Sequence, residues 1–354
     1  MAICESLACV GGGALNSHIL CSNINNKNVV MKYIIPPFEK IFSLENLFKA
    51  WQDFKKGKKN KKDVADFSLH LVHNLSVLRN DIISGQYKHS GYLHFKINDP
   101  KPRDIHKASV RDRVVHHCLY SALYPHFDQK FIFDSYSCRL GKGTHKALSR
   151  FKQFSKEESG NCKRKIWILK CDIRKCFASV DHIVLKSILK EHIMCGKLFV
   201  VIESVIDSFS SGIPNKGIPL GNLTSQLFIN IYLHELDLYL KHRIKAKKYI
   251  RYADDFVIFS KNRNFLLSII TDIQEFLHIK LKSDLHNKKL LLKSLFSGFD
   301  FLGWIHFPNH KVLRTNTKKR MFKKLAHSTN PKTLTSYLGF LKHGNTNKIK
   351  KMLI

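Results

Sequence analysis

The stretch that decides the fold is Tyr249–Ser260, with the sequence YIRYADDFVIFS. Two runs of apolar and aromatic residues flank a pair of acids, so the stretch predicts a strand, a tight turn at Asp254 and Asp255, and a second strand. Adjacent acids at a turn are usually ordinary turn residues. A third acid changes this interpretation, because the apolar run Ile166–Cys171 predicts a buried strand that ends at Asp172. If the strands are neighbours, three carboxylates meet at one point.

Such a cluster of acids would repel itself and calls for bound cations. The rest of the chain is strongly basic, with 60 Lys and Arg against 27 Asp and Glu and a formal net charge of +33. Hard oxygen ligands with room for water and phosphates suit Mg²⁺. Two such ions about 4 Å apart activate a 3′-hydroxyl and stabilise a leaving pyrophosphate in an in-line displacement. The acids therefore indicate metal-dependent phosphoryl transfer.

The composition limits the class of protein. The 354 residues, 44% of them hydrophobic, argue against general disorder and suffice for one large domain or two to three small ones. The positive charge makes a polyanionic partner the default interpretation, with lysine-favouring codon bias as the alternative. Nine cysteines without a Cys-x-x-Cys pair indicate free thiols in a reducing compartment. No apolar run approaches the roughly 18 residues that span a bilayer, so we expect a cytoplasmic protein without a membrane partner.

The remaining chain divides into segments of distinct pattern. Residues 1–35, which include a Gly11–Gly13 run and Asn-rich sequence, predict a disordered leader, and Met31 is an alternative start. Alternation over Tyr92–Ile97 predicts a strand. Apolar residues at helical spacing predict a helix at 44–54, with Ser43 as its N-cap. The same spacing predicts helices at 64–78, at 223–238 and over much of the last forty residues.

Several motifs, in order, resemble those of a reverse transcriptase. The segments Asp172–Phe177 and Tyr252–Asp255 are similar to its palm motifs, and Phe301–Trp304 is similar to its primer grip. Order and spacing agree from about residue 40 to 345, and the other matching segments are 103–105, 111–117, 135–145 and 219–226. The resemblance implies an RNA-directed DNA polymerase with an α+β, right-hand fold. Its palm would be ferredoxin-like, an antiparallel sheet with helices on one face.

The resemblance also implies domains, cofactors and ligands. We expect N-terminal helices and fingers at 36–165, a palm at 166–306 with a fingers-side insertion at about 185–215, and a short basic helical thumb at 307–354. The implied cofactor is a pair of Mg²⁺ ions, with Mn²⁺ as a substitute. The implied ligands are template RNA, nascent cDNA and deoxynucleoside triphosphates. The thumb would lie on the template–primer duplex, so affinity should fall steeply with salt.

The palm motifs carry the implied catalytic residues. By resemblance, Asp172, Asp254 and Asp255 are the catalytic acids and metal ligands, and the Ile173 carbonyl completes a metal shell. Phe177 occupies the position of the family's steric gate, where a bulky ring would clash with a ribose 2′-hydroxyl. The alternative for Phe177 is an ordinary core residue.

The resemblance assigns the candidate cations less uniquely. Arg103, with Lys101 as a second candidate, matches the fingers cations that clasp the triphosphate, and a guanidinium can bind phosphate through two hydrogen bonds. Lys288 falls where the family keeps a lysine thought to protonate the departing pyrophosphate, and Lys289 is a close rival. Arg111 and Arg113 either contact the template backbone or stabilise the fold through ion pairs. We treat both as candidates for primer or template binding.

The remaining candidates lie in two motifs beside the expected nucleotide. We expect Leu220 and Gln226 at the incoming nucleotide, and Gly221 at the primer and template. By the same resemblance, Leu302 and Gly303 form the primer grip.

Leu220 indicates the subfamily. The sequence of residues 220–226, LGNLTSQ, is similar to that of diversity-generating retroelements of bacteria and phages. Most relatives, group II intron enzymes included, have Gln in place of Leu220 and Ser-Pro in place of Ser225–Gln226. Leu offers only apolar contact, so base discrimination should weaken and cDNA synthesis should be error-prone. The resemblance further implies a dedicated template RNA and a small basic accessory protein that forms a ring.

Two other functions stay open on the sequence. A defence-associated, anti-phage reverse transcriptase would use the same chemistry to make protective cDNA. A catalytically inactive RNA-binding scaffold is the third possibility, and the complete set of acids argues against it.

Overall fold

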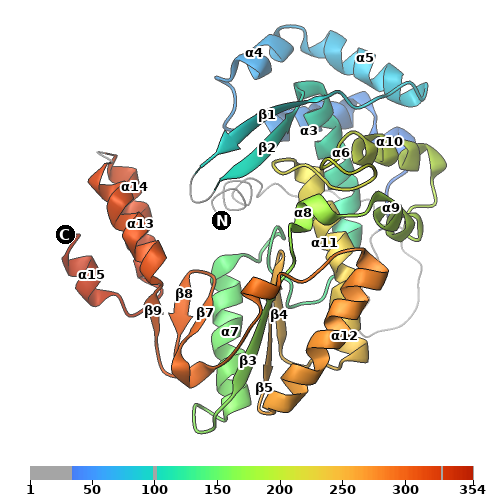
Figure 1. Ribbon diagram of the computed structural model, residues 1–354. Coiled ribbons are helices and arrows are strands. Elements are labelled where there is room, and N and C mark those ends of the chain that lie inside the picture. The colour runs from blue at the N-terminus through green and yellow to red at the C-terminus, as the bar shows by residue number, and fades with distance from the viewer. Residues whose placement is uncertain (1–33, 99–101, 328–329, 354) are drawn as a thin grey trace, which may run out of the picture.

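The protein is described by a computed structural model that covers residues 34–98, 102–327 and 330–353 (Figure 1). A four-stranded antiparallel sheet lies at its centre, in the order β4-β5-β3-β6. Its strands are β3 (Trp167–Asp172), β4 (Tyr249–Tyr252), β5 (Asp255–Ser260) and β6 (Leu291–Ser294). The helix α11 (Leu223–Leu238) precedes β4, and α12 (Arg263–Leu281) joins β5 to β6. This β-α-β-β-α-β arrangement confirms the expected ferredoxin-like palm.

Both faces of this sheet are buried, which explains why its strands are continuous apolar runs. Alternate residues of each strand belong to two separate cores. On β3, for example, Leu169 packs toward α11 and α12, whereas Ile168 packs with residues of α7 (Thr144–Ser159). The expectation of helices on one face only is therefore wrong. The helix α7 covers the second face, although it lies within the segment 36–165 that we assigned to the fingers (Figure 1).

The N-terminal part forms the upper body of the molecule (Figure 1). Its hairpin consists of β1 (Tyr92–Ile97), which matches the predicted strand, and β2 (Arg103–Ala108). The predicted helix at 64–78 is in fact two helices that meet at His70. The leader predicted at 1–35 lies almost wholly outside the described residues. The helices of this part are α2 (Phe38–Ile41), α3 (Leu44–Lys55), α4 (Lys62–Leu69), α5 (Leu71–Ile83) and α6 (Val110–Asp128).

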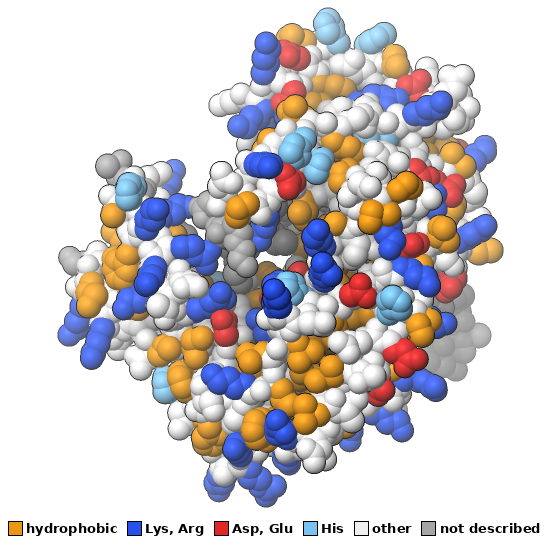
Figure 2. Space-filling view, in the orientation of Figure 1, with side chains coloured by type: hydrophobic (Ala, Val, Ile, Leu, Met, Phe, Trp, Pro, Cys, Tyr) orange, Lys and Arg blue, Asp and Glu red, His pale blue; other side chains and the backbone are white. Residues whose placement is uncertain are grey.

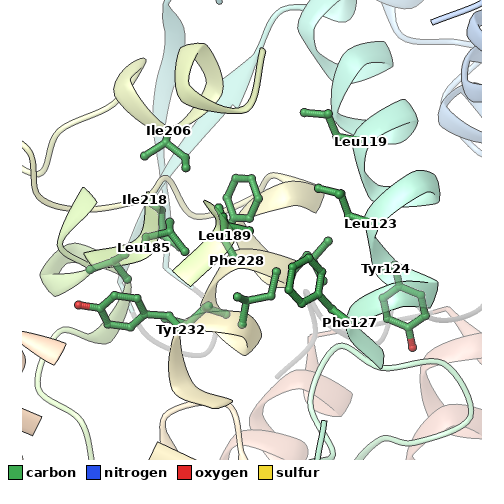
Figure 3. Packing of buried hydrophobic residues seen from close by; sticks show 14 of the residues in the cluster. Leu119, Leu123, Tyr124, Phe127, Leu185, Leu189, Ile206, Ile218, Phe228 and Tyr232 are labelled. Carbon is green, nitrogen blue, oxygen red and sulfur yellow. The ribbon is translucent and has the colours of Figure 1, made fainter. Parts of the chain in front are cut away.

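The segment after β3 packs against the N-terminal part. It contains the helices α8 (Cys176–Ser179), α9 (His182–Lys190) and α10 (Gly196–Asp207). Side chains of α6, α9, α10 and α11 meet in one buried cluster, in which Leu123 and Phe127 face Phe228 and Leu189 (Figure 3). This shared core joins the N-terminal part to the palm.

The C-terminal helices form a separate lobe beside the palm (Figure 1). A small antiparallel sheet leads into them and consists of β7 (Phe299–Phe301), β8 (Trp304–His306) and β9 (Lys311–Leu313). The helices are α13 (Thr315–Ala326), α14 (Pro331–Leu341) and α15 (Asn347–Lys351), as the helical spacing predicted. Trp304 is fully buried and packs against Phe340 and the backbone of Gly344, where a side chain would clash with the indole ring.

Two further expectations concern the chain as a whole. The six cysteines among the described residues are all free thiols, as predicted from their spacing. Within the same residues, no helix is both long enough and apolar enough to cross a membrane.

The packing of α7 on the sheet gives a stability prediction. Phe151 is fully buried, with its ring centroid 4.9 Å from that of Phe259 and 5.2 Å from that of Phe301. Phe151→Ala should lower the free energy of unfolding by about 3–5 kcal/mol, because the cavity cannot close. Phe48→Ala on α3 is the control, since that ring is 46% exposed, and should cost less than about 1 kcal/mol. Equal losses in urea unfolding would contradict the assignment of α7 to the second face.

Candidate active site

The three acids meet at one end of the central sheet. Asp172 ends β3 and lies directly opposite Asp255, the first residue of β5. Asp254 is in the two-residue turn between β4 and β5, and its carbonyl accepts a hydrogen bond of 3.3 Å from the backbone N–H of Ile173. The other turn residue, Ala253, has a left-handed φ of +54°, which costs energy in any residue except glycine. Strain of this kind concentrates at functional sites.

A cleft of about 980 Å³ is lined by Asp254 and Asp255, whereas Asp172 is not among its lining residues. It is bounded by the β1–β2 hairpin, the palm and the first C-terminal helix, which contributes Thr317 and Arg320. In Figure 2 the surface is hollowed between the C-terminal lobe and the rest of the molecule, with Lys and Arg side chains around the hollow. Most of the predicted site residues line this one cleft: Arg103, Phe177, Leu220, Gly221, Gln226, Asp254, Asp255, Leu302 and Gly303.

Hydrogen bonds join the segment before α11 to the β1–β2 hairpin. The carbonyl of Leu220 accepts a hydrogen bond of 3.1 Å from the N–H of His106, and Asn222 Nδ2 donates to the His106 carbonyl at 3.0 Å. Gly221 has a φ of +106°, and a Cβ there would lie 2.9 Å from Ile105 Cγ2. A side chain at Gly221 would therefore crowd Ile105 on β2 and would also be strained at this φ.

The turn between β7 and β8 brings a second backbone segment to the cleft. Leu302 and Gly303 both have positive φ, +49° and +86°, as in the two-residue turns that suit a twisted hairpin. The Gly303 carbonyl accepts a hydrogen bond from the N–H of Arg314, the residue before α13. This contact ties the turn to the beginning of the C-terminal lobe.

The acids have perturbed electrostatics. Burial raises the pKa of Asp254, the negative charge of Asp172 raises it further, and the positive charges of Lys289 and Arg103 oppose both. Burial also raises the pKa of Asp255 to about 6, against the opposing charge of Lys170, whose Nζ lies 3.9 Å from Asp255 Oδ1. Burial thus disfavours the charged form of both carboxylates.

The carboxylate oxygens of these acids are of the ligand type that hard divalent cations prefer. Within the described ranges, no three His, Cys, Asp and Glu side chains are gathered tightly enough to ligate one ion together. Both oxygens of Asp172 instead accept hydrogen bonds from Lys289 Nζ, at 2.7 and 2.8 Å. A metal ion on Asp172 would therefore compete with this lysine for the same two oxygens.

Comparison with known proteins identifies the family. The sequence profile described as "Reverse transcriptase (RNA-dependent DNA polymerase)" matches residues 96–306, more than half of the chain. The chain belongs to this family. Reverse transcriptases generally use divalent metal ions, which agrees with the donor set of the acids.

Individual relatives are distant. The reverse transcriptase is 24% identical over 287 residues to the protein YkfC of Escherichia coli, covering 70% of this chain and 73% of that one. It is also 24% identical to the group II intron-encoded protein LtrA of Lactococcus lactis, covering 64% of this chain and 47% of LtrA. A solved structure of apo telomerase from Candida tropicalis aligns at 13% identity and a TM-score of 0.48, covering 62% of this chain and 48% of that one. The reverse transcriptase thus spans about half the length of the last two proteins.

Some predicted residues of the reverse transcriptase lie elsewhere. Arg111 donates to Asp81 at 2.7 Å, and Arg113 donates to Asp63 at 2.5 Å. Neither arginine lines the catalytic cleft, so the structure favours ion pairs that hold the fold over contacts to template. Their contact with primer or template stays a prediction.

The remaining predicted residues are also placed. The rival lysine, Lys289, and not Lys288, contacts an acid of the centre. Ile173 is buried next to the acids, with 1% of its surface exposed. Lys101 lies outside the described residues.

A buried hydrogen-bond network that was not predicted from the sequence supports the turn between β4 and β5. Arg251 on β4 is fully buried and donates to both carboxylate oxygens of Asp237 on α11, at 2.8 and 2.6 Å. Its Nη1 also donates to the Ala253 carbonyl at 3.3 Å and to Asn230 Oδ1 at 3.1 Å. Tyr249 adds a third hydrogen bond to Asp237, at 2.7 Å. The signal was a charged residue inside an otherwise apolar strand, which demands a buried partner.

Removal of that partner should destabilise the reverse transcriptase. Asp237→Ala leaves the Arg251 guanidinium buried and unpaired, so the free energy of unfolding should fall by about 3–5 kcal/mol in urea titrations. The control is Asp53→Ala, which removes a surface pair with Lys56 and should cost less than about 1 kcal/mol. A loss at Asp237 as small as that of the control would show that the buried pair does not hold the turn.

Proposed function

We propose that this reverse transcriptase extends a primer along an RNA template with deoxynucleoside triphosphates and two Mg²⁺ ions, and that it serves error-prone cDNA synthesis in a diversity-generating retroelement. The observation that supports the chemistry is the meeting of Asp172, Asp254 and Asp255 at one end of the central sheet, where the last two line a cleft of about 980 Å³. The observation that supports the role is Leu220 in the wall of the same cleft.

In this proposal the acids hold the metal ions, and the Ile173 carbonyl adds an oxygen ligand. When bound, the two ions supply an activated 3′-hydroxyl and stabilise the negative charge of the departing pyrophosphate. The chain contributes the fixed positions of the ligands. Asp172 and Asp255 are held by the β3–β5 pairing, and Asp254 is held by the turn that Arg251 supports.

The walls of the cleft would select and hold the nucleotide. Arg103, at the start of β2, would bind the triphosphate from the fingers side, where its charge already acts on Asp254. Phe177 would exclude a 2′-hydroxyl with its ring, and its backbone position is fixed because its carbonyl accepts a hydrogen bond of 2.8 Å from Ile218. Gln226 would contribute polar contact at the same nucleotide.

Template and primer would follow the other residues of the cleft. Gly221 gives the backbone a close approach to the template, and the turn at Leu302 and Gly303 would support the primer end. The cations Arg314 and Arg320 would bind primer phosphates from the lobe of α13 to α15. The partners of the complete system, in this proposal, are a dedicated template RNA and a small basic accessory protein.

The first test of the function is the loss of an acid. Asp254→Asn should lower primer extension on an RNA template by at least about a hundredfold, because the amide cannot supply the charge that holds a metal ion. Asp284→Asn is the matched control, since that acid is exposed and lies outside the cleft, and it should extend primers like the parent. Equal incorporation by the Asp254 variant and the parent would instead favour the scaffold interpretation.

The second test concerns fidelity. Leu220→Gln should reduce misincorporation opposite template adenines several-fold, because a side-chain amide can hydrogen-bond near the base pair and Leu cannot. Leu220→Met keeps an apolar side chain of similar size and should keep the parent's error rate. Sequenced cDNA from the three proteins measures both. An unchanged rate in the Gln variant would contradict the role of Leu220 and the retroelement assignment that rests on it.

A further inference from the structure

The shortest ion pair among the three acids is that between Asp172 and Lys289. Lys289 Nζ lies 2.7 Å from one oxygen of Asp172 and 2.8 Å from the other. The Asp172 side chain is 7% exposed, whereas the Lys289 side chain is 46% exposed. The carboxylate is thus fixed in the protein, and the long side chain that neutralises it reaches in from the surface.

Backbone hydrogen bonds hold the Cα of Lys289 close to Asp172. The carbonyl of Asp172 accepts a hydrogen bond of 2.8 Å from the N–H of His286, which immediately precedes the 3₁₀ turn η2 (Asn287–Lys289). The N–H of Lys289 in turn donates to the His286 carbonyl. The position of the Cα is therefore determined, while the flexible four-carbon stem can swing the ammonium away.

The other two acids have no equally close cation within the described chain. The nearest ion pair is that of Lys170 with Asp255, at 3.9 Å, beyond hydrogen-bond distance. Asp172 alone is neutralised by direct contact, although all three acids are candidates for the same metal ions. A divalent ion on Asp172 would also stand within a few ångströms of the ammonium and repel it.

We propose that Lys289 is the internal counter-ion of the metal-free centre. It occupies both oxygens of Asp172 until a divalent cation displaces it, and so it weakens metal binding at this acid. This inference rests on the proposed function, because it presumes that Asp172 is a metal ligand.

Direct metal binding tests the proposal without any turnover. Mn²⁺ is titrated into the full chain, and the free ion is followed by electron paramagnetic resonance. Lys289→Ala should bind Mn²⁺ about three- to tenfold more tightly than the parent, because the ion no longer competes with an ammonium. Lys289→Arg keeps a cation and should bind like the parent.

The neighbouring lysine provides the matched control. Lys288→Ala removes the same formal charge one residue away, and should leave the Mn²⁺ affinity within about twofold, since no ion pair joins Lys288 to an acid among the described residues. In an Asp172→Asn background, the Lys289→Ala change should have no effect on affinity. That result would place the competition at Asp172.

The outcomes separate the two hypotheses. Equal effects of Lys289→Ala and Lys288→Ala on Mn²⁺ affinity, or weaker Mn²⁺ binding by Lys289→Ala, would contradict the counter-ion role of Lys289. Either result would still be consistent with metal binding by the acids. Absence of Mn²⁺ binding in every variant would overturn both the counter-ion and the two-metal function. Thermal unfolding in chelator gives a second readout: Lys289→Ala should lose stability without metal and regain it when Mn²⁺ is added.

Discussion

The position of the acids depends on the register between β3 and β5. Both faces of the central sheet are buried, and successive side chains such as Ile168 and Leu169 belong to different cores. A slip of one residue would send every side chain of β3 to the wrong core. The register is therefore fixed by the packing of apolar groups, and it places Asp172 opposite Asp255. The hydrophobic effect in this way sets the geometry of a charged site.

A second constraint acts on the turn that carries Asp254. The Arg251–Asp237 pair lies in the interior, where removal of two charges from water costs several kcal/mol before their attraction is counted. Such a pair is a poor source of stability compared with apolar side chains of the same volume. The pair instead orients the turn between β4 and β5, because the same guanidinium also donates a hydrogen bond to the Ala253 carbonyl. The pair holds a strained turn in the orientation that presents an acid to the cleft.

The sequence was sufficient to predict those elements whose pattern lies within a short stretch of the chain. Alternation and apolar runs located β1 and the strands of Tyr249–Ser260, and the order of motifs indicated a family that the comparison confirmed. It failed where the answer depends on packing between distant segments. The place of α7 on the second face, the partner of Arg251, and the choice between Lys288 and Lys289 all depend on side-chain directions in the folded chain. No spacing rule contains that information.

The charges of the chain explain why a counter-ion belongs at this centre. A net charge of +33 attracts phosphates to the whole surface, and cations such as Arg103 and Arg314 line the cleft itself. Asp254 and Asp255, by contrast, repel a triphosphate. An ammonium on Asp172 reduces this repulsion before metal arrives, and its exposed side chain lets it leave when metal binds.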